Sequence, residues 1–143
     1  MIILDTNVVS EAMKPSAEPR VIAWLDDQVV ETTFVTSVTL GELLFGIEAL
    51  PRGRRKSALA KALGEVLGLF EGRILPFDAE AARRYAEIAA KARSAGRPLS
   101  LADAYIAGTA AAHGFSVATR DVEPFLASGL SVINPWNEGG RVR

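Results

Sequence analysis

The chain has 143 residues, a formal net charge of −1 and a pI near 5.9, and 49% of its residues are hydrophobic. This length favours one domain with a core of ordinary size, and no apolar run is long enough to cross a bilayer. No basic segment precedes the short apolar start, so we expect no export signal and no membrane partner. The absence of cysteine excludes disulfides and thiolate metal sites and fits a cytoplasmic protein. A net charge near zero gives no general attraction to nucleic acid, so such a partner would need a local basic patch.

Short apolar segments alternate with longer amphipathic segments along the whole chain. Strands are expected at residues 2–4, 32–36, 73–76, 115–118 and 132–133. Helices are expected at residues 8–13, 20–27, 40–50, 57–70, 77–95 and 100–113. Because most of these helices have ten or more residues and lie between strands, the pattern predicts a single α/β domain, with a mainly parallel central sheet flanked by helices.

The first strand ends abruptly in Asp5, which Thr6 and Asn7 follow. An ionised carboxylate at the end of a buried strand is costly unless hydrogen-bond donors or a cation meet it. Ligands of parallel α/β sheets bind at the carboxyl ends of the strands, where Asp5 would lie. Aspartate, threonine and asparagine are also good helix caps, so Asp5 alone is consistent with a cap or with a site.

Three further acids occupy comparable positions, since Asp121 follows a strand while Glu42 and Asp103 lie near the starts of helices. Residues 100–103, Ser-Leu-Ala-Asp, also resemble a capping box, so a purely structural role for Asp103 stays open. If the four carboxylates converge, their mutual repulsion requires a cation or raised proton affinities. With no cysteine and one histidine, the matching ion is Mg²⁺ or Mn²⁺, which suits phosphoryl chemistry.

Four segments contain these acids in characteristic surroundings. They are Met-Ile-Ile-Leu-Asp-Thr-Asn-Val-Val-Ser-Glu at 1–11, Val-Thr-Leu-Gly-Glu-Leu at 38–43, Leu-Ala-Asp-Ala-Tyr-Ile-Ala at 101–107 and Val-Ala-Thr-Arg-Asp at 117–121. In these segments the chain resembles the PIN-domain ribonucleases, and more narrowly the VapC/FitB type of toxin from bacterial toxin–antitoxin modules. Gly-Arg-Ile-Leu-Pro-Phe-Asp at 72–78 and Asn-Pro-Trp at 134–136 extend the resemblance over nearly the whole chain.

The resemblance implies a PIN-like fold and a metal-dependent endoribonuclease. Its catalytic and metal-binding residues would be Asp5, Glu42, Asp103 and Asp121. Asp5 and Asp103 would be the principal Mg²⁺ ligands, and the other two acids would act through water or on a second ion. Ligands or waters would be oriented by Thr6, Asn7 and Thr119. The resemblance also implies an RNA substrate, a cognate antitoxin and a homodimer.

Contacts with RNA are expected at five basic residues: Arg52, Arg54, Arg55, Lys56 and Arg120. The run at 52–56 is also typical of a solvated helix start, although the helix dipole disfavours positive charge at that end. Both interpretations of the run stay open. Pro124 departs from the family pattern, because many relatives carry an acid there, and this leaves the role of the rim beyond Asp121 open.

Other classes of protein also place an aspartate after a strand. Receiver domains and haloacid-dehalogenase-type phosphatases bind Mg²⁺ there, but such a phosphatase needs a second aspartate where this chain has Asn7. A dinucleotide-binding module needs a Gly-x-Gly-x-x-Gly after its first strand, and this chain has none there. A PIN scaffold without nuclease activity, which acts only as a binding partner, is the alternative that remains, although the presence of all four acids argues against it.

Overall fold

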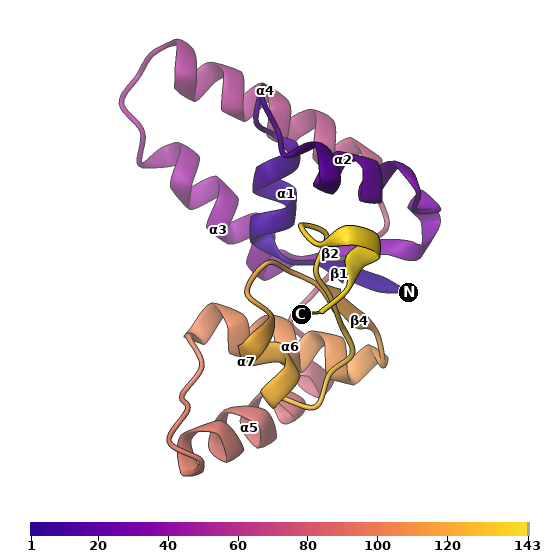
Figure 1. Ribbon diagram of the computed structural model, residues 1–143. Coiled ribbons are helices and arrows are strands. Elements are labelled where there is room, and N and C mark those ends of the chain that lie inside the picture. The colour runs from indigo at the N-terminus through magenta and orange to yellow at the C-terminus, as the bar shows by residue number, and fades with distance from the viewer. Residues whose placement is uncertain (143) are drawn as a thin grey trace.

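A computed structural model describes residues 1–142, in which strands and helices alternate (Figure 1). The strands are β1 (Ile2–Leu4), β2 (Thr33–Thr36), β3 (Ile74–Leu75), β4 (Ser116–Ala118) and β5 (Val132–Ile133). The helices are α1 (Thr6–Ala12), α2 (Pro19–Asp26), α3 (Ser37–Glu48), α4 (Arg54–Leu69), α5 (Ala79–Ser94), α6 (Leu101–His113) and α7 (Val122–Ala127). Two 3-10 turns, η1 (Val30–Thr32) and η2 (Glu138–Gly140), complete the order.

The strands form one sheet in the order β3-β2-β1-β4-β5, and every pairing is parallel. Strand β1 lies in the centre, where Ile3 pairs with Phe34 of β2 and with Val117 of β4. A central parallel strand is covered on both faces, which explains why its residues form an unbroken apolar run. The predicted α/β class with a mainly parallel sheet is therefore confirmed.

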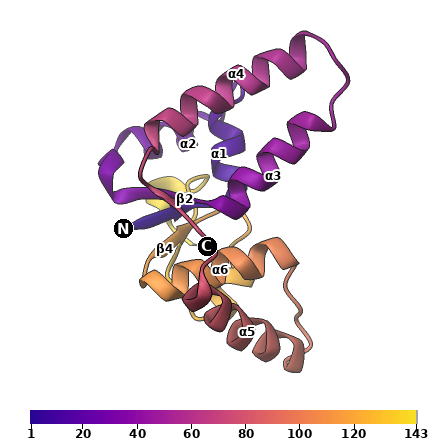
Figure 2. The ribbon, with the colours of Figure 1, turned by 180° about the vertical axis from the view of Figure 1, so that it is seen from behind.

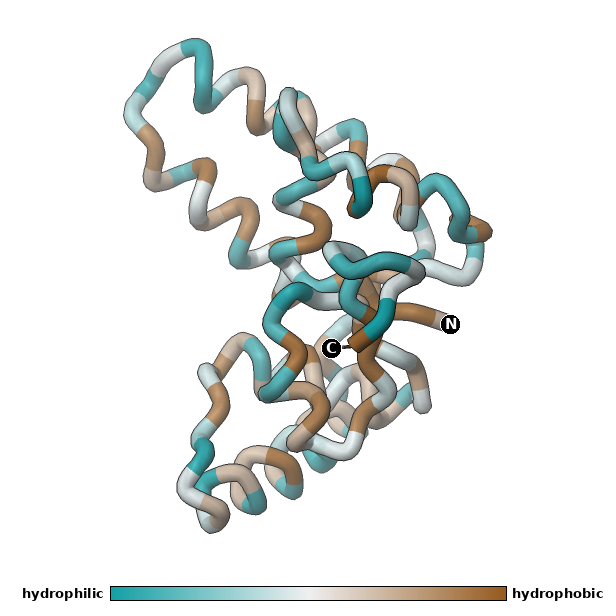
Figure 3. Tube along the Cα trace, viewed as in Figure 1, coloured by the Kyte–Doolittle hydropathy of each residue, from teal (hydrophilic) through white to brown (hydrophobic). Residues whose placement is uncertain are grey.

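Helices cover both faces of the sheet, as Figures 1 and 2 show from opposite sides. Helices α1 to α4 lie on one face, and α5, α6 and α7 lie on the other. Successive residues of β1 point to opposite faces, so Ile3 packs with Ile106 of α6 and Leu4 packs with Val8 of α1. Apolar residues accordingly gather along the central strands (Figure 3).

Helices α5 and α6 approach each other closely at Gly108. A Cβ added at this residue would lie 2.7 Å from the carbonyl oxygen of Ala81 and 2.8 Å from the backbone nitrogen of Tyr85. The rings of Tyr85 and Tyr105 lie 4.8 Å apart beside this crossing, and Phe77 packs 4.5 Å from Tyr105. The small residues of α6 therefore permit the close packing of α5 and α6.

Several element boundaries differ from the sequence predictions. Helix α4 begins at Arg54, three residues earlier than expected, so most of the basic run lies in its first turn. Helix α3 begins at Ser37, also three residues earlier than expected, and is capped by Thr36, whose hydroxyl accepts a hydrogen bond from the Thr39 amide at 3.1 Å. Helix α7 is absent from the elements that the sequence predicted. Across residues 1–142 there is no helix with the length and apolar character to span a membrane.

Candidate active site

Asp5 lies at the carboxyl end of β1 and also caps α1. Its Oδ1 accepts a hydrogen bond from the Thr6 amide at 2.8 Å, and its Oδ2 accepts one from the Thr119 hydroxyl at 2.8 Å. The Asn7 side-chain amide lies 3.4 Å from the same Oδ2. Only 4% of Asp5 is exposed. Asp5 can therefore be a helix cap and a site residue at once. Its Oδ1 caps α1, and its Oδ2 faces the end of the neighbouring strand β4.

Asn7 and Thr119 tie the ends of β1 and β4 together. Asn7 donates from Nδ2 to the Thr119 hydroxyl at 3.2 Å, and its Oδ1 accepts from the Arg120 amide at 3.2 Å. The Thr119 hydroxyl in turn accepts from the Asp121 amide at 3.1 Å. These bonds hold the backbone that carries Asp121 in place beside Asp5.

Glu42 reaches the site from the second turn of α3, near the helix start, where the sequence predicted it. Its Oε1 accepts a hydrogen bond of 2.6 Å from the Thr6 hydroxyl, which also lies 3.1 Å from the hydroxyl of Thr39. Thr6 therefore connects Glu42 to the chain immediately after Asp5.

Asp103 lies in the first turn of α6, where its amide donates to the Ser100 hydroxyl at 3.2 Å. Ser100 is thus the helix cap, as the capping-box pattern predicts. Burial raises the pKa of the Asp103 carboxyl, the Ser100 hydrogen bond lowers it, and the charges of Asp121 and Glu42 raise it further. The capping role of Ser100 explains the helix start but not why this carboxylate lies close to two others.

The carboxylates influence one another across the site. Burial raises the pKa of Asp5 to about 6, although hydrogen bonds from Thr119 and Thr6 oppose that rise. The charges of Asp103 and Glu42 add to it. Thr119 links Asp5 to Asp121, and Thr6 links Asp5 to Glu42. Since the charges of Asp121 and Glu42 also act on Asp103, the four predicted acids lie at one edge of the sheet.

This carboxylate cluster fits a partly hydrated cation. Within residues 1–142, no three acidic or histidine side chains are close enough together to hold an ion directly. Mg²⁺ commonly keeps several waters and binds through one or two carboxylates, so a looser arrangement of oxygen donors suits it. The buried charge of Asp5 beside like charges gives a cation a reason to bind there.

The predicted basic run lies at the turn between α3 and α4 and in the first turn of α4: Arg52, Arg54, Arg55 and Lys56. This turn is at the end of α3 remote from the sheet (Figure 1). Lys56 donates to the Glu48 carbonyl at 3.1 Å and so helps to close the turn. Arg55 lines a groove of 850 Å³ between α1, α3 and α4, whose lining also includes Thr6 and Glu42. The groove thus extends from Glu42 to Arg55 in the basic run.

Arg120 is exposed and lies beside the acids, as its place in the sequence requires. Its guanidinium carbon lies 5.3 Å from the ring centroid of Trp136. The sequence shows Trp136 in a segment that resembles the family but gives no sign of this contact, because the tryptophan lies sixteen positions after Arg120.

A buried acid outside the site, Glu11, has a structural role. Its carboxylate accepts hydrogen bonds of 3.0 Å from the Glu18 amide and from the Lys14 ammonium group. These bonds lower the pKa of Glu11. Glu11 therefore anchors the segment between α1 and α2, and it leaves the four predicted acids as the cluster of interest.

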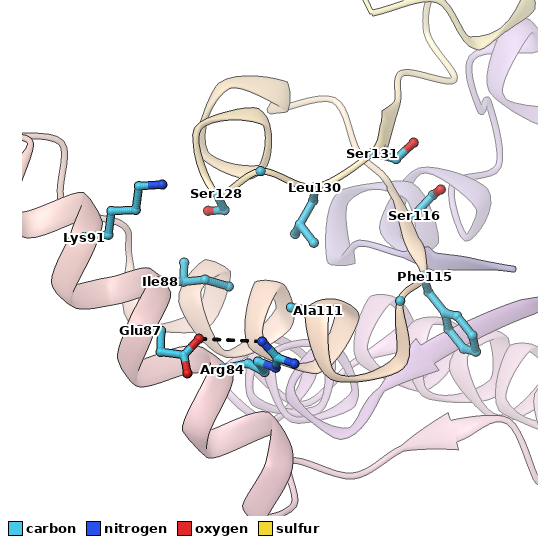
Figure 4. Close-up of a pocket in the computed structure, with 12 residues that line it drawn as sticks. Arg84, Glu87, Ile88, Lys91, Ala111, Phe115, Ser116, Ser128, Leu130 and Ser131 are labelled. Carbon is cyan, nitrogen blue, oxygen red and sulfur yellow. Dashed lines mark ion pairs between the residues drawn. The ribbon is translucent and has the colours of Figure 1, made fainter.

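A second hollow, of 470 Å³, lies at the opposite edge of the sheet (Figure 4). It is lined by residues of α5 and α6 and by the residues that precede β4 and β5. Arg84 projects into it but is ion-paired with Glu80 at 3.4 Å and with Glu87 at 3.7 Å. None of the four acids lines this hollow, so it is separate from the carboxylate cluster.

Comparison with known proteins places the chain in a family. The PIN domain matches residues 2–127. The chain is 50% identical to "VapC ribonuclease Y4jK" of Sinorhizobium fredii, over 95% of this chain and 98% of that protein. It is 44% identical to "Toxin FitB" of Neisseria gonorrhoeae, over 96% of this chain and 100% of that protein.

Solved structures agree with these relatives. The structure of FitAcB from Neisseria gonorrhoeae matches with a TM-score of 0.90 and 44% identity, over 96% of this chain and 99% of that chain. The DNA-bound VapBC from Salmonella typhimurium matches with a TM-score of 0.71 and 27% identity, over 92% of this chain and 95% of that chain. The chain therefore belongs to the PIN-domain family, in the group that contains VapC and FitB.

Proposed function

We propose that this protein is a metal-dependent endoribonuclease and the toxin of a toxin–antitoxin module. The convergence of four carboxylates at the carboxyl edge of the sheet carries the proposal: Asp5, Glu42, Asp103 and Asp121. Relatives named as a VapC ribonuclease and a FitB toxin support it. A cytoplasmic location, which the absence of cysteine favours, is part of this proposal.

Each acid has a role that follows from its surroundings. Asp5 and Asp103 would hold Mg²⁺ or Mn²⁺, which when bound polarises a phosphate oxygen and lowers the pKa of a water. Thr119 and Asn7 hold Asp5 in one orientation through its Oδ2. Thr6 holds Oε1 of Glu42 and leaves its Oε2 for a water.

Asp121 has a different environment from Asp5, because its side chain does not cap α7. Its amide is held by Thr119, so the backbone is fixed while the carboxylate can turn toward the site. Asp121 and Glu42 would accordingly act through water or on a second ion.

The proposal is tested by cleavage of single-stranded RNA with Mg²⁺, with Mn²⁺ and with excess chelator. We expect cleavage only with a divalent ion, and none in the double variant Asp5→Asn, Asp103→Asn. Mn²⁺ should also raise the melting temperature of the wild type, because an ion that binds only the folded state stabilises it. The matched control is Glu65→Gln, which changes an exposed acid on α4. A stabilisation by Mn²⁺ that persists in the double variant would place the ion elsewhere.

The alternative is a PIN scaffold that binds partners without cutting RNA. The looser arrangement of the acids, in which no three within residues 1–142 hold an ion directly, is the observation in its favour. It predicts no cleavage under any divalent ion together with unimpaired antitoxin binding, so the same assay decides between the two.

A cognate antitoxin and a second copy of the chain are the proposed protein partners. The solved VapBC relatives support the first, since one of them is described as a member of a family of toxin–antitoxin systems. An antitoxin arginine could bind the site carboxylates bidentately and block the metal ions. Exposed apolar residues on α3, Leu44 at 45% and Phe45 at 76%, support a homodimer. Equal antitoxin affinity for the wild type and Asp5→Asn without Mg²⁺ would show that inhibition uses another surface.

A further inference from the structure

Arg120 lies next to an acidic cluster and yet is directed away from it. Its backbone amide is bound to Asn7 and its neighbour is Asp121, but none of the ion pairs within residues 1–142 joins its guanidinium to an acid. The guanidinium instead lies over the ring of Trp136, 5.3 Å from the centroid. The charge of Arg120 also contributes to the lowered pKa of Glu11 on α1, so the guanidinium lies on the α1 side of the site.

Trp136 is held firmly in a short closed loop after β5. The Asn134 amide donates to the Gly140 carbonyl at 3.0 Å and closes the loop, and the Trp136 amide donates to the Asn134 side chain at 3.0 Å. The Trp136 carbonyl lies 3.5 Å from a guanidinium nitrogen of Arg20 on α2. The ring also packs against the apolar cluster of β1 and α1. Little conformational freedom therefore remains to be lost when a ligand binds at the ring.

The two residues have the chemistry of a base-stacking site. A guanidinium is planar and weakly hydrated, so it can stack on an aromatic ring with one face and on a nucleobase with the other. Arg120 is exposed, which leaves a face for such a base, while Trp136 holds the group away from the carboxylates. Arg20 is a second exposed cation near this platform, at the Trp136 carbonyl, and its charge would suit a phosphate of the same strand.

We infer that Arg120 and Trp136 form a platform on which one nucleobase of single-stranded RNA stacks, beside the phosphate that a cation bound by the acids would contact. The inference rests on the proposed function, because it takes RNA as the substrate. In this platform Trp136 positions the Arg120 guanidinium, and Arg120 contacts the base as well as the RNA backbone. A purely structural alternative exists, in which Trp136 fills the end of the core and Arg120 merely covers it.

The experiment combines protein variants with RNA lacking single bases. Short single-stranded RNAs, each with one abasic nucleotide at a different position, are bound to Asp103→Asn and cut by the wild type. Loss of the stacked base should weaken binding and kcat/KM by about 5- to 30-fold at one position. Arg120→Lys keeps the charge but loses the planar group. In this variant, removal of the base at that RNA position should no longer change binding or kcat/KM.

Two variants control for charge and for folding. Arg83→Lys changes an exposed arginine on α5 that pairs with Glu80 at 3.0 Å, and it should keep the full abasic effect. Trp136→Leu keeps an apolar side chain but removes the ring, so it should reduce the abasic effect. If that variant melts much lower than the wild type, the comparison of Arg120→Lys with the wild type decides by itself, because Arg120 is exposed.

An abasic effect of equal size in Arg120→Lys and the wild type, or no sensitive position at all, would overturn the platform. The failure of the proposed function looks different, because a wild type that cuts no RNA would refute nuclease activity. The binding comparison in Asp103→Asn would still decide whether a base stacks on Arg120.

Discussion

The two helical hairpins that carry site acids, α3–α4 and α5–α6, are packed in opposite ways. In α5–α6, the backbones approach so closely at Gly108 that a Cβ would overlap the backbone of Ala81 and Tyr85. In α3–α4, a Cβ at Gly46 or Gly64 would meet nothing within 4 Å. The α3–α4 hairpin also encloses part of the groove and leaves Phe45 exposed.

This difference in packing gives the two hairpins different roles: one holds a site acid in place, and the other leaves a groove open beside the site. The tightly packed α5–α6 hairpin fixes the first turn of α6 and so the position of Asp103. The open α3–α4 hairpin brings Glu42 to the site through the Thr6 hydroxyl and leaves a groove that a partner can enter. Small residues are frequent in both hairpins, so composition alone does not decide how closely the helices pack. Close packing requires the glycine to lie on the face that contacts the other helix, as Gly108 does and Gly46 and Gly64 do not.

The largest effect is expected for Asp103→Asn, on the tightly packed hairpin. Loss of a principal metal ligand should reduce cleavage by about 100-fold or more, since even outer-shell changes cost up to that much. The melting temperature should stay equal or rise, because a repelling charge is removed and Ser100 still accepts the amide of residue 103. Retained activity with a large loss of stability would mean that residue 103 matters only for the helix start.

The packing contrast itself is tested by alanine at two glycines. Gly108→Ala should lower the free energy of unfolding by about 3 kcal/mol, because the backbone of α5 must move to admit a methyl group. Gly46→Ala, the matched variant on α3, should raise it by about 0.5 to 1 kcal/mol, because alanine stiffens the unfolded chain without a clash. Urea denaturation measures both. Equal changes in the two variants would mean that the hairpins do not differ in packing.

A pH dependence is expected from Asp5, which lies between the two hairpins. Its folded pKa of about 6 exceeds the ordinary value of 3.8, so the metal-free native state binds more protons between these values. The free energy of unfolding should therefore fall as pH rises from about 4 to 6, by at most about 3 kcal/mol from this group. Asp5→Asn should lack this component, since asparagine still caps a helix.

The measurement is the difference in unfolding free energy between the wild type and Asp5→Asn as a function of pH, in chelator. The wild type should lose stability relative to the variant up to about pH 6 to 7 and then run parallel to it. Mg²⁺ should diminish the difference at neutral pH, because a cation compensates the charge. A difference that grows in the other direction would contradict the raised pKa.

Local signals account for most of what the sequence predicted correctly. The β1 strand and its terminal Asp5 follow from a β-branched run that stops at an acid, and Asp78, Ser100 and Gly114 mark helix ends by their own chemistry. The predicted start of α4 was wrong, because its cap, Gly53, has no side chain to signal it. The six residues of α7 are too few for a helical period to show.

Contacts between distant segments could not be predicted in the same way. Arg120 meets Trp136 only because β4 and β5 pair in parallel, with Ala118 opposite Ile133. That register depends on the whole sheet, so no window of sequence reveals it. The convergence of Glu42 with Asp5 likewise depends on the direction of α3 as it leaves β2. The order of acids along the chain indicated the site, whereas its geometry required the fold.

The smallest effect is expected at the end of the open hairpin, from the basic run. If Arg52 and Arg54 bind phosphates, the double variant Arg52→Gln, Arg54→Gln should weaken RNA binding without altering base preference. The slope of log affinity against log salt should fall by about 0.7 for each phosphate of a single strand that the variant no longer neutralises. The matched control, Arg83→Gln, removes one charge from α5 on the other face of the sheet and should leave the slope unchanged. An unaltered slope in the double variant would show that Arg52 and Arg54 bind no phosphate and only form the solvated start of α4. The contacts with RNA would then have to come from other residues, such as Arg120 at the edge of the sheet.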